Sequence, residues 1–178
     1  MLIRPALEAD KIMGNQIRND KADKKVFLKL SNGATDVLLS VLILSGADLA
    51  VTQWEKELMV WLAAHDQSVF GSGTVGFDID EIAWTRENFY EQQAFLLTTI
   101  DLAITRHRWN SLSYDPPFAQ EQLKNLRIIV KNYLFEYVEA ARLWDWRVEL
   151  DSFSKCPVHK VYLHEQGCLI CHDEGLDS

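Results

Sequence analysis

The 178 residues of this chain are enough for one domain with a short appendage, and 48% of them are hydrophobic, which excludes overall disorder. The chain holds 26 acidic and 18 basic residues, a formal net charge of -8, which disfavours unassisted binding to nucleic-acid phosphates. A signal-peptide core and an apolar run of about 18 residues are both lacking, and the odd number of cysteines fits a reducing compartment, so we predict a cytoplasmic protein that crosses no membrane.

The first third of the chain changes from polar to strongly apolar. Residues 1–25 are mixed in charge and poor in apolar side chains, so we expect a frayed helix or a mobile arm there. Val26–Leu30 begins with a β-branched residue and predicts a short strand. A helix is expected to begin at Thr35 or in the preceding turn and to run through Ser45, and Gly46 has the position of a helix stop. This helix is apolar on every side, which places it in the middle of the core.

Two further helices are marked by their N-terminal signals. Thr52 followed by Glu55 forms a capping box, and the helix that it starts is closed by Gly71. The next helix is expected to begin after Thr85 and to run to about Trp109. Its start has the aromatic pair of a hydrophobic staple, Trp84 and Phe89.

The segment Asp115-Pro116-Pro117 interrupts the chain and precedes a last long helix, expected over residues 119–144. Residues 148–150 alternate in polarity, which suits a second strand that pairs with Val26–Leu30. The predicted fold class is therefore mainly α: a helical bundle of about four substantial helices with one or two short strands. We divide the chain into an N-terminal arm (1–25), a helical domain (26–150) and a zinc-binding tail (151–178).

All three cysteines lie near the end of the chain, in Cys156-Pro157-Val158-His159 and Cys168-Leu169-Ile170-Cys171. A zinc ion is satisfied by four nitrogen or sulfur donors, and two ligands separated by two residues reach one ion from a tight turn. Gly167 can adopt the backbone conformations that such a turn requires. The spacing predicts one zinc site. Its ligands are Cys156, His159, Cys168 and Cys171. Four protein ligands leave no open position for water, so we interpret this zinc as structural.

Several alternatives compete with this ligand set. His164 and His172 are close enough in sequence to replace His159 as the fourth ligand. A further alternative is that the three cysteines are reduced thiols with no common role. Cys168 and Cys171 could also form a redox pair, but such pairs occur in a βαβ context, which we do not find in this sequence. The tail resembles a zinc ribbon or zinc knuckle over its last 20 or so residues, although His172 stands where such a knuckle often has glycine.

Candidate sites outside the tail rest on weaker patterns. In an extended chain Asp78 and Asp80 point to one face, where they can contact a cationic partner together with Glu81, or chelate Mg²⁺. The simpler interpretation is a surface segment with solvated acids. His65 and His107 lie on the apolar stripes of their helices, where a histidine is more often a hydrogen-bonded core residue than a catalytic one.

Five short stretches of the chain carry a family resemblance: Ser31-Asn32-Gly33-Ala34-Thr35-Asp36, Trp54-Glu55, Asp66-Gln67-Ser68, Gly73-Thr74-Val75-Gly76-Phe77-Asp78 and Phe95-Leu96-Leu97. With the Cys-x2-His and Cys-x2-Cys tail, they resemble an uncharacterised bacterial family of small helical proteins. The resemblance covers most of the chain after residue 25. It implies a bacterial cytoplasmic protein and carries neither an activity nor a catalytic residue.

Together these patterns favour a non-enzymatic helical interaction protein with a structural zinc. In its most concrete form it is an adaptor or neutralising partner of a basic bacterial protein, which it contacts through Asp78, Asp80 and Glu81. The first alternative is a nucleic-acid-binding or transcription regulator that contacts phosphates through its zinc tail and nearby cations, Arg106, Arg108, Lys155 and Lys160. The second alternative is a metal-dependent enzyme at the Asp78/Asp80 loop.

Overall fold

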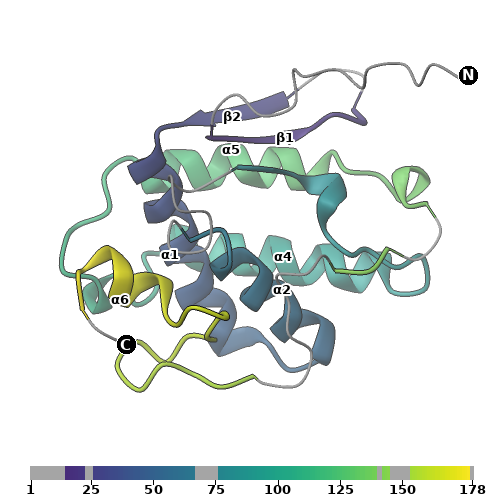
Figure 1. Cartoon of the computed structure of the whole chain (residues 1–178). Coiled ribbons are helices and arrows are strands. Elements are labelled where there is room, and N and C mark those ends of the chain that lie inside the picture. The colour runs from purple at the N-terminus through teal and green to yellow at the C-terminus, as the bar shows by residue number, and fades with distance from the viewer. Residues whose placement is uncertain (1–14, 23–25, 67–75, 140–141, 145–152, 177–178) are drawn as a thin grey trace, which may run out of the picture.

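Four substantial helices build the core of the protein, as predicted. The computed structural model describes residues 15–22, 26–66, 76–139, 142–144 and 153–176. Within these residues a fifth, short helix and three short strands complete the fold (Figure 1). The helices are α1 (Asn32–Leu49), α2 (Gln53–Ala63), α4 (Phe89–Ile104), α5 (Ala119–Lys131) and α6 (Leu169–Asp173).

A small sheet covers one side of the helices. Its strands are β1 (Asn15–Asn19), β2 (Val26–Leu30) and β3 (Phe77–Asp78), in the order β2-β1-β3. Strand β1 pairs with β2 in antiparallel and with β3 in parallel orientation. The β1–β2 pair lies against α5, on the side of the helices away from α6 and the C-terminal segment (Figure 1).

The expectation of a frayed helix or mobile arm was wrong for the end of the first segment, where β1 forms. Alternate side chains of β1 are buried, and Ile17 at its centre is fully buried. Polar residues occupy the two other inward positions, so a count of apolar residues missed the strand. The strand predicted at Val26–Leu30 is confirmed, and its described partner is β1. Residues 148–150, which were also predicted to pair with Val26–Leu30, lie outside the described residues. The same holds for residues 1–14 of the predicted arm.

Helix α1 begins in the turn before Thr35, one of the two starts that the sequence left open, and it extends beyond its predicted end. Ser31 caps it by accepting a hydrogen bond at Oγ from the amide of Ala34 (3.1 Å), so the helix begins before Thr35. Gly46 does not stop the helix, which continues to Leu49. The Met59 side chain of α2 packs directly against the Cα of Gly46, in the space that a Cβ would occupy.

The capping box predicted for α2 is confirmed. Thr52 accepts a hydrogen bond from the amide of Glu55 (3.3 Å), and the Glu55 carboxylate accepts one from the amide of Thr52 (2.8 Å). The helix ends at Ala63, before the predicted stop at Gly71, which lies outside the described residues.

Helix α4 begins later and ends earlier than predicted, since the predicted helix starts directly after Thr85 and runs to about Trp109. Gln92 binds the amide of Thr85 at 2.9 Å and its hydroxyl at 3.1 Å, so the turn after Thr85 stays outside the helix. The rings of the predicted staple, Trp84 and Phe89, do touch, with centroids 5.6 Å apart. At the other end Arg106 has a left-handed backbone conformation, which ends the helix before Trp109.

Helix α5 ends at Lys131, so the prediction of a helix through residue 144 was wrong. The reason lies in α4: Gln93 donates hydrogen bonds to the carbonyls of Val130 (3.0 Å) and Tyr133 (2.7 Å), which satisfies backbone groups that the helix end leaves open. The chain then turns away, and the buried Tyr133 ring stacks on Trp84.

Helix α1 is the central helix of the core. It is 18 residues long and apolar enough to be considered as a membrane span, but 67% of it is buried inside the protein. It contacts all four other helices. Its apolar surface therefore faces protein, as its all-round apolar sequence predicts.

We predict a graded effect of alanine at three glycines. A Cβ at Gly76 would meet the backbone carbonyl of Gln16 in β1, which cannot turn aside, so Gly76→Ala should lower the free energy of unfolding by about 1–3 kcal/mol. Gly46→Ala should cost less, because the flexible Met59 thioether can move. Gly33→Ala is the control, since no atom of the described residues lies within 4 Å of a Cβ added at Gly33. Urea denaturation measures all three, and equal stability of the Gly76 and Gly33 variants would refute the close contact.

Candidate metal centre

The first pair of predicted ligands lies on one tight turn. The amide of Cys156 donates to the carbonyl of Val161 (2.8 Å), and the amide of Lys160 donates to the carbonyl of Cys156 (2.9 Å). Lys160 takes a left-handed conformation with φ of 54°, which closes the turn. The turn brings Cys156 and His159 to the same side, so both point inward.

The second pair lies at the start of α6. Cys168 directly precedes the helix and Cys171 lies within it. Gly167 has φ of 114°, a conformation that residues with a side chain rarely adopt, and it exchanges two backbone hydrogen bonds with His164. The glycine therefore turns the chain from the first pair into α6, in the role expected from the sequence.

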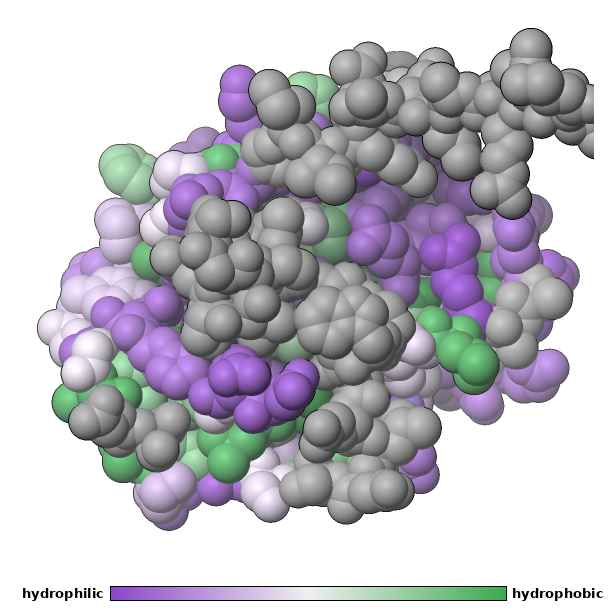
Figure 2. Space-filling model, in the orientation of Figure 1, coloured by the Kyte–Doolittle hydropathy of each residue, from purple (hydrophilic) through white to green (hydrophobic). Residues whose placement is uncertain are grey.

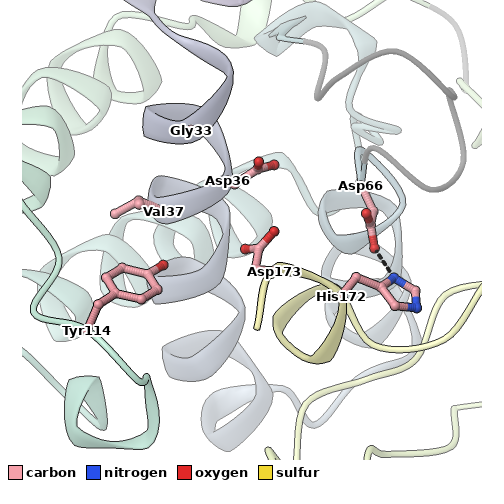
Figure 3. Close-up of a pocket in the computed structure, with 7 residues that line it drawn as sticks. All are labelled: Gly33, Asp36, Val37, Asp66, Tyr114, His172 and Asp173. Carbon is pink, nitrogen blue, oxygen red and sulfur yellow. Dashed lines mark hydrogen bonds and ion pairs between the residues drawn. The ribbon is translucent and has the colours of Figure 1, made fainter. Parts of the chain in front are cut away.

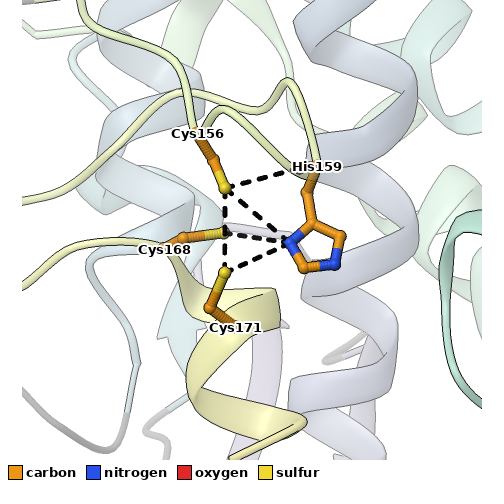
Figure 4. A group of neighbouring side chains, drawn as sticks. All are labelled: Cys156, His159, Cys168 and Cys171. Carbon is orange, nitrogen blue, oxygen red and sulfur yellow. Dashed lines mark hydrogen bonds between the residues drawn. The ribbon is translucent and has the colours of Figure 1, made fainter. Parts of the chain in front are cut away.

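The four side chains converge on one point (Figure 4). All four are buried, and Cys156 and Cys171 have their sulfurs 3.7 Å apart. Nδ1 of His159 lies 3.8, 3.7 and 3.4 Å from the sulfurs of Cys156, Cys168 and Cys171. Donors bound tetrahedrally at about 2.0–2.3 Å are separated by about 3.5–3.8 Å. The spacing of the donors therefore suits a tetrahedral metal ion.

A carboxylate and an arginine support the histidine. Nε2 of His159 lies 3.3 Å from a Glu174 carboxylate oxygen, which leaves Nδ1 to face the sulfurs. The other Glu174 oxygen accepts the amide of Ser113 (2.8 Å). Arg108 donates to the carbonyl of His159 and forms an ion pair with Asp48 of α1 (3.0 Å). A carboxylate behind a ligating histidine is the usual arrangement in metal sites, where it fixes the ring.

The thiols lie in an environment that calls for a compensating cation. Burial raises the pKa of the Cys168 thiol to about 12 and also raises the pKa of Cys171. At Cys156 burial is outweighed by hydrogen bonds from the amides of His159 and Val158, and the pKa is lowered. A divalent cation would stabilise all three as thiolates, which are the forms that bind metal.

His164 and His172 do not compete with His159 in this geometry, because both bind Asp66. Nε2 of His164 and Nδ1 of His172 lie 2.9 Å and 2.6 Å from the same Asp66 oxygen. They form a second group of three possible metal ligands, which the sequence analysis missed. The sequence offered no signal for it, since Asp66 precedes His172 by 106 residues.

Asp78 and Asp80, candidates for a cationic partner or Mg²⁺, are engaged within the fold. Asp78 is buried, which raises the pKa of its carboxyl group, and it accepts the amides of Asp80 (2.9 Å) and Asp20 (3.2 Å). Asp80 accepts the Tyr133 hydroxyl (2.6 Å) and pairs with Arg142 (2.7 Å). The candidate partner residue Glu81 is exposed, although one of its oxygens accepts the amide of Asp78 (3.2 Å).

The cations considered for phosphate contacts are mostly bound within the protein. Arg106 pairs with Asp115, and Lys155 donates to the carbonyl of Ala47 (2.8 Å), while Lys160 is exposed. The two other histidines have hydrogen-bond partners. Nδ1 of His65 binds the Trp61 carbonyl in the core, and His107 binds Asp48.

Comparison with family models, with curated proteins and with solved structures found no match to this chain. Function is therefore argued from the geometry of the described residues. Their most specific feature is the buried group of three thiols and one imidazole.

We predict that His159, and neither of the other tail histidines, completes the metal shell. His159→Ala should abolish tight metal binding because it removes the only nitrogen that faces the three sulfurs among the described residues. His164→Ala and His172→Ala should keep the thiolate site. Co²⁺ loading reports this directly through the sulfur-to-cobalt absorption band, together with metal analysis. Loss of that band in the His164 variant and its retention in the His159 variant would reverse the assignment.

We also predict a supporting role for Glu174. Glu174→Gln should weaken metal binding about 10- to 100-fold, because the amide cannot hold the His159 ring as the carboxylate does. Competition with a chelator measures the affinity. Glu165→Gln is the matched control, since Glu165 is an exposed acid of the same segment. Equal affinity of the two variants would show that Glu174 does not position the ligand.

Proposed function

We propose that this chain is a zinc-stabilised helical interaction protein without catalytic activity at its metal. The observation that carries the proposal is the complete set of four buried protein donors at tetrahedral spacing. Thiolate and imidazole donors select zinc over Mg²⁺ or Ca²⁺. A shell closed by protein leaves no position for a reacting water, so the ion holds the segment together. Reduced thiolate ligands fit the cytoplasm of the bacterial source that the sequence resemblance implies.

The partner we propose is a basic protein, for which the chain acts as an adaptor or neutralising partner. Support comes from the net charge of -8 and from the surface around Asp78 and Asp80. There five carboxylates outnumber three cations. The carboxylates belong to Asp20, Asp78, Asp80, Glu81 and Glu139, and the cations to Arg18, Lys21 and Arg142. Asp78 and Asp80 hold this surface in place, and the exposed acids Asp20, Glu81 and Glu139 face the partner. We call these three residues the acidic rim.

Affinity capture with the zinc-loaded chain from an extract of its source organism tests this function. A basic protein should be retained at about 0.05 M salt and released at about 0.5 M, because salt screens exposed charges. The double variant Asp20→Lys/Glu81→Lys should no longer retain the basic protein. Glu91→Lys/Glu121→Lys is the charge-matched control, with exposed acids on α4 and α5.

Two outcomes would contradict the proposal. One is a captured partner that binds wild-type chain and rim variant equally. The other is a gel shift in which the zinc-loaded chain binds nucleic acid at physiological salt, while the Lys160→Glu variant does not bind it. That result would favour the alternative of a nucleic-acid regulator.

A further inference from the structure

Two stacked aromatic rings lie at the surface near the acidic rim. Tyr90 belongs to the first turn of α4, and Phe135 lies in the segment after α5. Their rings are nearly parallel, with an interplanar angle of 9° and centroids 5.8 Å apart. Tyr90 is 66% exposed, whereas Phe135 is partly buried and packs against the hydrophobic core. The core therefore holds one ring in place, and that ring supports the exposed one. We call the pair the aromatic shelf.

The aromatic shelf already carries one guanidinium group. The Cζ atom of Arg86 lies 4.2 Å from the centroid of the Phe135 ring, and a nitrogen of the same group donates to the carbonyl of Val138 (2.8 Å). A guanidinium is planar and more weakly hydrated than an ammonium, so it stacks readily on an aromatic face. The contact between Arg86 and Phe135 shows that these rings accept a flat cation.

The contacts around the shelf connect it to the acidic rim. Val138, which binds Arg86, directly precedes the rim residue Glu139. Tyr133 of the same segment donates its hydroxyl to Asp80 (2.6 Å), which holds the surface of the rim. At the right of Figure 2, hydrophilic side chains gather where β1 ends in Figure 1, and hydrophobic side chains lie beside them. A partner that contacts the rim therefore finds aromatic surface close by.

The surface around the shelf is negatively charged. Two segments form it, residues 86–91 and 131–139, and together they hold four exposed glutamates against two cations. The glutamates are Glu87, Glu91, Glu136 and Glu139, and the cations are Arg86 and Lys131. Of the cations, Arg86 already binds within the protein. An exposed ring among carboxylates attracts a cationic side chain and disfavours an acidic one.

We propose that the basic partner places an arginine side chain on the exposed face of Tyr90, near the carboxylates of Glu87 and Glu91. The inference rests on the proposed function, because it names the side-chain chemistry of the basic protein at this surface. Arginine suits the site better than lysine, since its planar group stacks on a ring while its edge binds a carboxylate. An arginine on Tyr90 repeats the contact that Arg86 makes with Phe135.

Titration of the zinc-loaded full chain with hexa-arginine and with hexa-lysine at about 0.05 M salt tests the inference, because the two peptides carry equal charge. Fluorescence anisotropy of labelled peptides gives the dissociation constants, and hexa-arginine should bind more tightly. Tyr90→Leu should weaken hexa-arginine binding about two- to fivefold, the gain from one exposed cation–π contact, and should change hexa-lysine binding much less. Tyr90→Trp should keep or increase the preference for arginine, since indole is the best ring for such a contact.

Phe118→Leu is the matched control. Phe118 is an exposed aromatic residue at the other end of α5, where it lines a hollow together with Arg106 and Lys124. This variant should bind both peptides as the wild type does. A nuclear Overhauser effect between the arginine side chain and the Tyr90 ring should accompany binding to the wild-type chain. Circular dichroism and zinc content confirm that each variant is folded.

Four results would overturn the arginine site. They are unchanged hexa-arginine binding in Tyr90→Leu, an equal loss of both peptides in that variant, an equal loss in Phe118→Leu, or no binding of either peptide to the wild-type chain. The proposed function is judged separately. If Asp20→Lys/Glu81→Lys loses both peptides while Tyr90→Leu retains both, the acidic rim acts without the shelf. The interaction function then stands and the arginine site does not.

Discussion

The convergence of three thiols and one imidazole on a single point is the constraint on which the C-terminal segment depends. Residues 153–176 contain one five-residue helix and two isolated bridges, which is little regular structure to fix a chain. An ion bound by the four side chains would supply the order that hydrogen bonds and packing do not provide in so short a segment. The ligands are themselves buried next to Val161, Leu169 and Ile170, so the metal centre continues the hydrophobic core.

Helix α6 transmits this constraint to the helical domain. Cys171, His172 and Asp173 at the end of α6 and the capping residue Glu174 contact, in that order, the thiolate cluster, Asp66 after α2, Ser40 of α1 and the ring of His159. Figure 3 shows the His172 ring beside the Asp66 carboxylate. A shift of α6 would disturb all four contacts at once. A metal bound there would therefore order its own turn and also determine how residues 169–174 lie on α1 and α2.

The parts of the structure that the sequence predicted are those decided by neighbouring residues. The ligand spacing, the capping box at Thr52 and the apolar core helix all follow from local patterns. The parts it could not predict depend on distant residues. The end of α5 is determined by Gln93 of α4, and the burial of Asp78 depends on β1, a segment whose sequence predicts an arm. Asp66 joins His172 only in the folded chain.

X-ray absorption at the zinc edge of the purified, zinc-loaded chain measures the central interaction most directly. A first shell of three sulfurs at about 2.3 Å and one nitrogen at about 2.0 Å, with the outer scattering of a single imidazole, is the expected result. A shell of two or fewer sulfurs, or one with two or more imidazoles, would contradict it. In that case His159 and the three cysteines would not act together, and the segment would need another source of order.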